Sequence, residues 1–100
     1  QLIPNSGGAI PVGVLNSKAI NLVQPQYSPA AKAVRASGEV NVQVVLDENG
    51  KVISVKAISG EYVLRPAAET AARASKFYSI IINEKPAKVT GIIVYNFALP

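Results

Sequence analysis

The middle of the chain carries the strongest folding signal. Apolar and polar residues alternate from Val40 to Leu46, which is typical of a strand with one buried face. Asn49-Gly50 follows, and this dipeptide supplies the positive φ angles that a tight hairpin turn needs. A second apolar segment over residues 51–58 then predicts a returning strand. The rest of the fold must therefore be arranged around a central β-hairpin.

A first helix is predicted before this hairpin. Ser28 can cap the free amides of its first turn, and Pro29 suits its first position. Gly38 stands where a left-handed residue would end the helix. The expected helix is short, so packing against another element must stabilise it.

A second helix is predicted after the hairpin, over residues 62–76. Pro66 fits only the first turn, and small alanines on one face would let the helix lie close against a sheet. Arg65, Glu69 and Arg73 are spaced four residues apart, so we expect them to form a charged ladder on the solvent side.

These elements predict one α+β domain. A last strand over residues 88–98 is expected to run beside the first strand of the hairpin, because strand–helix–strand crossovers are right-handed. The expected architecture is two helices packed on one face of a three-stranded antiparallel sheet of order 2-1-3. Residues 12–15 and 19–23 are expected to form a small N-terminal hairpin. Residues 1–11 are expected to be a linker or arm, and residues 12–100 the domain.

The composition excludes most kinds of enzyme. The 100 residues include no Cys and no His, so the chain lacks a thiolate nucleophile, an imidazole base and the common zinc ligands. No two carboxylates have a spacing that suggests a general acid and base. The acidic turn at residues 47–50 supplies too few oxygen ligands for calcium and is better explained as a hairpin turn. We therefore expect no catalytic residue, no metal and no cofactor.

The charge distribution favours an ordinary solvated surface over a nucleic-acid footprint. Ten basic and six acidic residues give a formal net charge of +4, but the basic residues are scattered along the chain. No apolar stretch approaches the roughly 20 residues of a membrane-spanning helix. The chain also has no Met, so we expect it to be part of a longer protein, with any membrane anchor in the missing part.

An ordered set of short motifs runs along nearly the whole chain. The motifs are Gln24-Pro-Gln-Tyr-Ser-Pro29, Gly38-Glu-Val-Asn-Val-Gln-Val-Val-Leu-Asp47, Gly50-Lys-Val52, Ile58-Ser-Gly60, Phe77 and Ile93-Val-Tyr-Asn-Phe97. Over roughly residues 14–98, this set resembles the C-terminal domain of the TonB family, the periplasmic energy transducers of bacteria with two membranes.

The resemblance implies a periplasmic domain of an inner-membrane-anchored protein. Its last strand would pair with the short TonB box peptide of an outer-membrane transporter, by the addition of a β-strand. The part outside this sequence would contact proton-driven motor proteins of the inner membrane. The partner-peptide-binding residues carried over by position are Gln24, Pro25, Tyr27, Ile92, Val94 and Asn96.

Two other functions stay open at this point. The last strand is apolar at residues 92–94, so it could instead pair with a second copy, as in a structural envelope module that forms a homodimer. The net positive charge permits nucleic-acid binding, but the aromatic residues available on the last strand, Tyr95 and Phe97, are better explained as core residues. Tyr27 also has a plain alternative, because it could act as a hydrophobic staple before the first helix.

Overall fold

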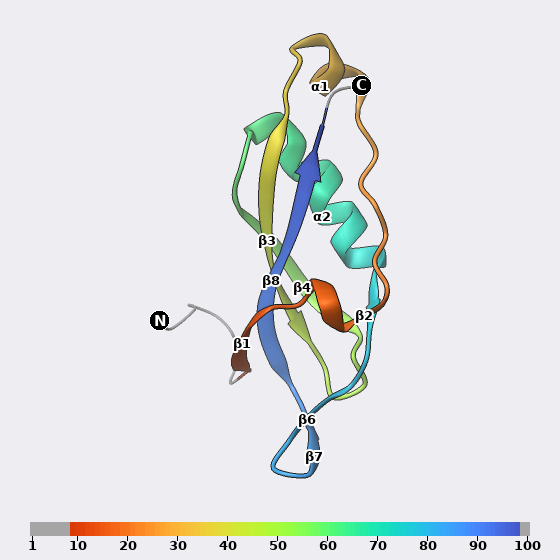
Figure 1. Ribbon diagram of the computed structural model, residues 1–100, viewed down its shortest axis with the longest axis vertical. Coiled ribbons are helices and arrows are strands. Elements are labelled where there is room, and N and C mark those ends of the chain that lie inside the picture. Colours follow the sequence, from red (N-terminus) through yellow and green to blue (C-terminus); the bar gives the residue numbers. More distant parts are fainter. Residues whose placement is uncertain (1–8, 99–100) are drawn as a thin grey trace.

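The structure is a computed structural model that describes residues 9–98, and one four-stranded sheet forms its centre (Figure 1). The molecule is elongated, with extents of 48 × 26 × 17 Å. The elements in chain order are β1 (Ile10–Val14), the 3₁₀ turn η1 (Asn16–Lys18), β2 (Ala19–Asn21), α1 (Pro29–Ala33), β3 (Gly38–Leu46), β4 (Val52–Ser59), the 3₁₀ turn η2 (Tyr62–Leu64), α2 (Arg65–Ala74), β5 (Lys76–Phe77), β6 (Ile80–Ile82), β7 (Lys85–Ala87) and β8 (Val89–Phe97).

The predicted central hairpin is confirmed. β3 and β4 pair antiparallel, and the carboxylate of Asp47 holds the turn by accepting the backbone amides of Asn49 and Lys51, each at 2.9 Å. Gly50 has a φ of 81°, and a Cβ at this position would collide with the carbonyl group of Phe77. Glycine is therefore required both by the turn and by the close approach of β5.

The predicted position of the last strand is also confirmed. β8 pairs antiparallel with β3 along its whole length, from Gly38 opposite Phe97 to Leu46 opposite Val89. The order β4-β3-β8 is therefore the expected 2-1-3 arrangement. On one face of these strands, alternate apolar side chains are fully buried, including Val42 of β3.

The sheet nevertheless has four strands, in the order β1-β8-β3-β4, and not three. β1 runs parallel to β8, and β2 pairs antiparallel with β5, so the predicted N-terminal hairpin is wrong. The physical reason is burial. Leu15 is packed in the core with 1% of its surface exposed, and the η1 turn that follows leads the chain away from β1 instead of back along it. Gly91 makes room for this, because a Cβ there would lie 2.7 Å from Cγ of Leu15.

α2 packs on the sheet, where it contacts β4 and β3. Its buried face consists of small side chains, as predicted: Ala68, Ala71 and Ala72. η2 precedes it, so the predicted helix over residues 62–76 is present with a 3₁₀ first turn and ends at Ala74. The expectation of two helices on one face of the sheet is wrong.

α1 is a single turn at one end of the molecule (Figure 1). The predicted cap is confirmed, since the Ser28 hydroxyl accepts the amide of Ala31 at 3.1 Å. The helix stops at Ala33 because little apolar surface supports it: Ala31 is its one buried residue, and Val34 is 67% exposed.

At the opposite end, β6 and β7 form a small hairpin that leads into β8 (Figure 1). Asn83 and Glu84 form its two-residue turn, with φ values of 52° and 68°. Across the described residues, neither helix has the length and apolar character needed to cross a membrane.

Candidate functional site

The outer edge of β8 is the edge at which the resemblance predicts peptide pairing, and β1 already covers part of it. The amide of Ile10 donates to the carbonyl oxygen of Lys88 at 3.1 Å, and the amide of Leu15 donates to that of Ile92 at 2.8 Å. In an antiparallel pair, every second residue turns its backbone groups away from the partner strand. Even-numbered residues of β8 therefore face away from β3 and toward β1.

Beyond the end of β1, a side chain forms hydrogen bonds with the outer edge of β8. The Asn16 amide group bonds both backbone groups of Val94: Oδ1 accepts its N–H at 2.9 Å, and Nδ2 donates to its carbonyl oxygen at 2.8 Å. A primary amide has a carbonyl group and an NH₂ group side by side, so it can replace the peptide group of a neighbouring strand. Because outward-facing residues alternate along the strand, the next outward-facing backbone groups belong to Asn96, which is an exposed residue.

The opposite edge of the sheet is closed by a different side chain. Oε2 of Glu69, on α2, accepts the amide of Ala57 on β4 at 2.7 Å. The predicted charged ladder on α2 is therefore replaced by other contacts, because Arg65 donates from Nε to the carbonyl oxygen of Gly60 at 3.0 Å and lies 5.3 Å above the Tyr62 ring. A carboxylate only accepts hydrogen bonds, so it satisfies an edge amide but cannot serve an edge carbonyl.

A groove of about 620 Å³ lies between the extended segment before α1 and helix α2. In Figure 1 this segment runs along the helix toward α1. The lining residues are small or apolar for the most part: Val23, Gln24, Pro25, Gln26, Tyr27, Ser28, Pro29, Pro66, Ala67, Thr70, Ala71 and Ala74. The groove therefore offers shape and apolar contact, with few fixed polar groups.

Tyr27 connects this groove to the end of β8. Its ring meets the ring of Phe97 edge to face, with centroids 5.6 Å apart and an interplanar angle of 87°. Its hydroxyl donates to the carbonyl oxygen of Ala36. Tyr27 therefore has a packing role, but its ring packs on β8 and not on α1 as a hydrophobic staple would, and these contacts hold the segment beside β8.

Ser75 makes a second connection between the same parts. Its Oγ accepts the amide of Val23 at 2.9 Å, donates to the carbonyl oxygen of Ala71 at 2.8 Å, and lies 3.5 Å from the Tyr95 hydroxyl. Burial raises the pKa of Tyr95 above its ordinary value of 10.0, and the contact with Ser75 lowers it by less.

The predicted site residues fall into two groups. Gln24 and Pro25 line the groove against α2, whereas Ile92 and Val94 lie on β8 beside the N-terminal segment. Tyr27 bridges the two groups through Phe97, and Asn96 lies at the end of β8. The structure thus brings the two groups to one side of β8 without placing them in a single pocket.

Sequence reasoning missed Asn16. The Asn-Ser-Lys sequence that contains it suggests a hairpin turn, and nothing in the local pattern indicates contact with a strand 78 residues away. One signal was available: Gly91 stands inside a strand of mostly large apolar residues, and such a glycine often marks the close approach of another backbone.

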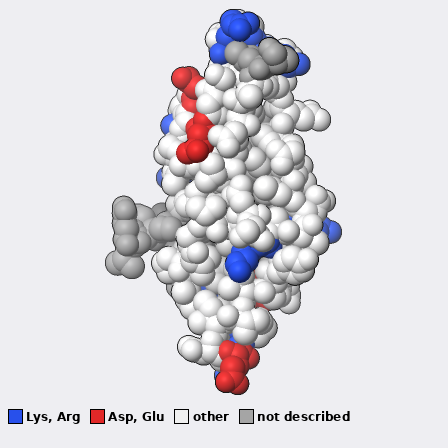
Figure 2. Space-filling view, viewed as in Figure 1, with Lys and Arg blue, Asp and Glu red and all other residues white. Residues whose placement is uncertain are grey.

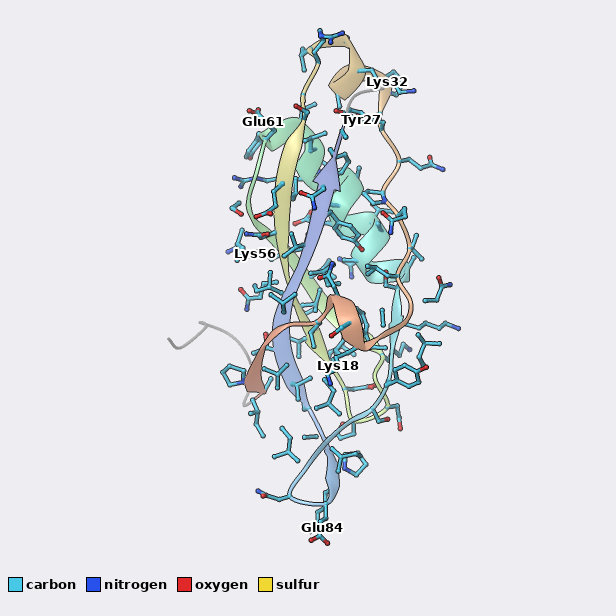
Figure 3. The ribbon with its side chains drawn as sticks, in the orientation of Figure 1. Lys18, Tyr27, Lys32, Lys56, Glu61 and Glu84 are labelled. Atoms are coloured by element: carbon cyan, nitrogen blue, oxygen red, sulfur yellow. The ribbon has the colours of Figure 1, made fainter. Side chains whose placement is uncertain are left out.

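Charged side chains lie mostly toward the two ends of the face shown in Figure 2. Lys32 lies at the α1 end and Glu84 at the β6–β7 end, while Lys18 and Lys56 lie between them (Figure 3). The surface around β8 on this face is therefore suited to backbone pairing and apolar contact more than to charge recognition.

Comparison with known proteins identifies the chain's relatives. Residues 23–99 match the family model described as Gram-negative bacterial TonB protein C-terminal. Proteins named Protein TonB from two strains of Xanthomonas campestris pv. campestris are each 38% identical over 81 residues, which is 79% of this chain and 36% of theirs. The chain thus spans about a third of the length of these curated relatives. The solution NMR structure of the Pseudomonas aeruginosa TonB C-terminal domain shares the fold, with a TM-score of 0.66 at 18% identity, covering 87% of this chain and 93% of that one.

Proposed function

This chain belongs to the family of TonB C-terminal domains, and on that premise we propose that it is a periplasmic peptide-binding module. In this proposal an extended peptide, the TonB box of an outer-membrane transporter, adds as a strand to the outer edge of β8. The observation that carries it is the pattern on that edge, where β1 and Asn16 satisfy outward-facing backbone groups of β8 as a partner strand would.

The two groups of predicted site residues have separate roles in this proposal. Backbone groups of Val94 and Asn96 pair with the peptide. The backbone groups of Ile92 face the same edge of β8, where its carbonyl oxygen accepts the amide of Leu15. Gln24, Pro25 and Tyr27 contact its side chains from the neighbouring segment, which Tyr27 holds beside Phe97. Affinity then comes from backbone hydrogen bonds, and selectivity comes from the groove.

The full-length protein would use this pairing to transmit force. We propose that its part outside this sequence anchors it in the inner membrane beside proton-driven motor proteins. A strand paired along β8 would be loaded in shear, so several backbone hydrogen bonds would resist a pull together. In this role the domain performs no chemistry and holds no cofactor.

NMR titration of the labelled domain tests the proposal. Synthetic peptides that contain the TonB box of outer-membrane transporters from the same organism should shift the backbone amides of residues 92–97 and of Gln24. A peptide N-methylated at alternate residues on its pairing side should bind more than about tenfold more weakly, because it loses at least one backbone donor and clashes with β8. The same peptide methylated on its other side is the matched control.

Two results would contradict the proposal. One is the absence of shifts on β8 with every such peptide, and the other is equal binding of both methylated forms. Sedimentation velocity at rising protein concentration separates peptide pairing from the alternative, in which a second copy of the domain pairs along β8.

A further inference from the structure

The N-terminal strap, defined as residues 10–21, lies on the edge of β8 that the proposed function assigns to the peptide. It comes before residues 23–99, the part of the chain that matches the family. Leu15 anchors the strap in the core with 1% of its surface exposed, whereas the next residues along it, Ser17 and Lys18, are exposed. The strap is therefore held by Leu15 and by the pairing of β1 and β2, while Ser17 and Lys18 between these strands are accessible.

Asn16 lies at the transition between these two parts. Its side chain is half-buried, and its amide group makes both of the hydrogen bonds that a partner strand would make to Val94. β1 ends at Val14 and the chain then turns away through η1, so at this position a side chain replaces a strand. Rotation about the Asn16 side-chain bonds would release Val94 without removing Leu15 from the core.

Glu69 and Asn16 both bond an edge of the sheet, but they offer different hydrogen-bonding groups. On the edge of β4, the Glu69 carboxylate satisfies an N–H group and offers no donor, so it closes that edge against strand addition. On the edge of β8, Asn16 both accepts and donates, which reproduces the hydrogen bonding of a strand at one residue only. An extended peptide offers the same pair of groups at every second residue, so it can bond Val94 and continue to Asn96.

We infer that Asn16 is a displaceable stand-in for the partner strand: its amide occupies Val94 in the free domain, and the backbone of an extended peptide replaces it on binding. This inference rests on the proposed function and adds a regulatory step to it. The free domain is then protected from unspecific strand pairing, because any entering strand must first displace a satisfied hydrogen-bond pair. Binding proceeds by exchange, and its apparent affinity is reduced by the small fraction of molecules in which Val94 is open.

Three variants of the labelled domain test the inference, with the TonB box peptides described above as probes. Asn16→Ala removes both hydrogen bonds to Val94. Asn16→Asp keeps the shape of the side chain but cannot donate to the Val94 carbonyl. Asn21→Ala is the matched control, since Asn21 is an exposed residue of the same strap.

The expected result has three parts. Asn16→Ala should bind the peptide about 5- to 30-fold more tightly than the unchanged domain, because the competing pair of hydrogen bonds is gone. In the absence of peptide, its Val94 amide should exchange with solvent at least about tenfold faster. In the unchanged domain, the side-chain NH₂ resonances of Asn16 should shift as the peptide saturates β8. Asn16→Asp should change affinity in the same direction as Asn16→Ala, and Asn21→Ala should change neither quantity.

The outcomes distinguish the inference from the proposed function. Peptide binding of equal or lower affinity in Asn16→Ala, or unchanged Asn16 side-chain resonances at saturation, overturns the inference while peptide pairing itself stands. Binding that is detected only after Asn16 is replaced supports both. If no peptide shifts β8 in any variant, the proposed function fails and the stand-in role fails with it.

Discussion

Ser75 shows how one hydroxyl group can join three parts of a small domain. It follows the last residue of α2, accepts the amide of Val23 from the segment beside the groove, and lies 3.5 Å from the Tyr95 hydroxyl on β8. Ser75 is 3% exposed and Tyr95 is 2% exposed, so both polar groups are inside the core. Their mutual contact satisfies groups that burial would otherwise penalise.

The buried Tyr95 predicts a loss of stability at alkaline pH. Its pKa is raised in the folded state, so the stabilisation is complete below the ordinary value of 10.0 and is lost as the pH rises through the raised value. Urea unfolding between about pH 8 and about pH 11 should show this loss, with a slope from this residue of at most about 1.4 kcal/mol per pH unit.

Tyr95→Phe isolates this contribution, because Phe cannot ionise. We expect the variant to be less sensitive to alkaline pH than the unchanged domain. Parallel stability curves for the two proteins over this pH range would contradict the assignment.

Among the smaller elements, β5 is held in place against charge repulsion. Lys76 of β5 is the direct antiparallel partner of Lys51, the residue that precedes β4, and both are exposed. Like charges directly opposite each other on neighbouring strands are destabilising. The pairing is maintained by backbone contacts, including the bond from the Phe77 amide to the carbonyl oxygen of Gly50 at 3.3 Å.

Lys76→Glu should therefore stabilise the domain. The change replaces a repulsive cross-strand pair with an attractive one, which we expect to raise the free energy of unfolding by about 0.5–1 kcal/mol at low salt. Urea unfolding measures the change. Lys85→Glu, which alters the net charge equally on another exposed strand, is the control and should not reproduce it. A gain that persists unchanged in about 1 M salt would argue against an electrostatic origin.

On the face shown in Figure 2, many charged side chains lie toward the two ends, and the proposed peptide site on β8 lies between them, with Lys18 as a basic neighbour (Figure 3). Backbone pairing over such a surface depends on hydrogen bonds between neutral groups and on apolar burial, neither of which ionic strength screens strongly.

The affinity for TonB box peptides should consequently change less than about threefold between about 50 mM and about 500 mM salt. Fluorescence anisotropy with a labelled peptide measures it. An oligonucleotide titrated under the same conditions gives the opposite expectation, since phosphate recognition would weaken by orders of magnitude over this range. A steep salt dependence of peptide binding would show that charge recognition dominates and would contradict pairing through neutral backbone groups.

Local patterns were enough to predict much of the architecture. The β3–β4 hairpin, the β4-β3-β8 order, α2 and the capped start of α1 were all predictable, because alternation, turn residues and caps act over a few neighbouring residues. It was harder to predict which side chains of a strand are buried. Strict alternation along β4 would place Ile53 on the same face as the buried Ala57, but Ile53 is 47% exposed while Val52 is buried, because the β3–β4 register shifts between Val45 and Leu46.

The sequence by itself thus determined the central hairpin, the strand that joins it, the packed helix and the family to which the chain belongs. Only the tertiary structure decided which segment lies on the outer edge of β8, and with it the contact between Asn16 and Val94. The physical reason is distance along the chain. Parallel strands are not joined by a tight turn, so no local sequence signal identifies β1 as the partner of β8. The contact between Asn16 and Val94 joins residues 78 positions apart and depends on the space that Gly91 leaves for Leu15.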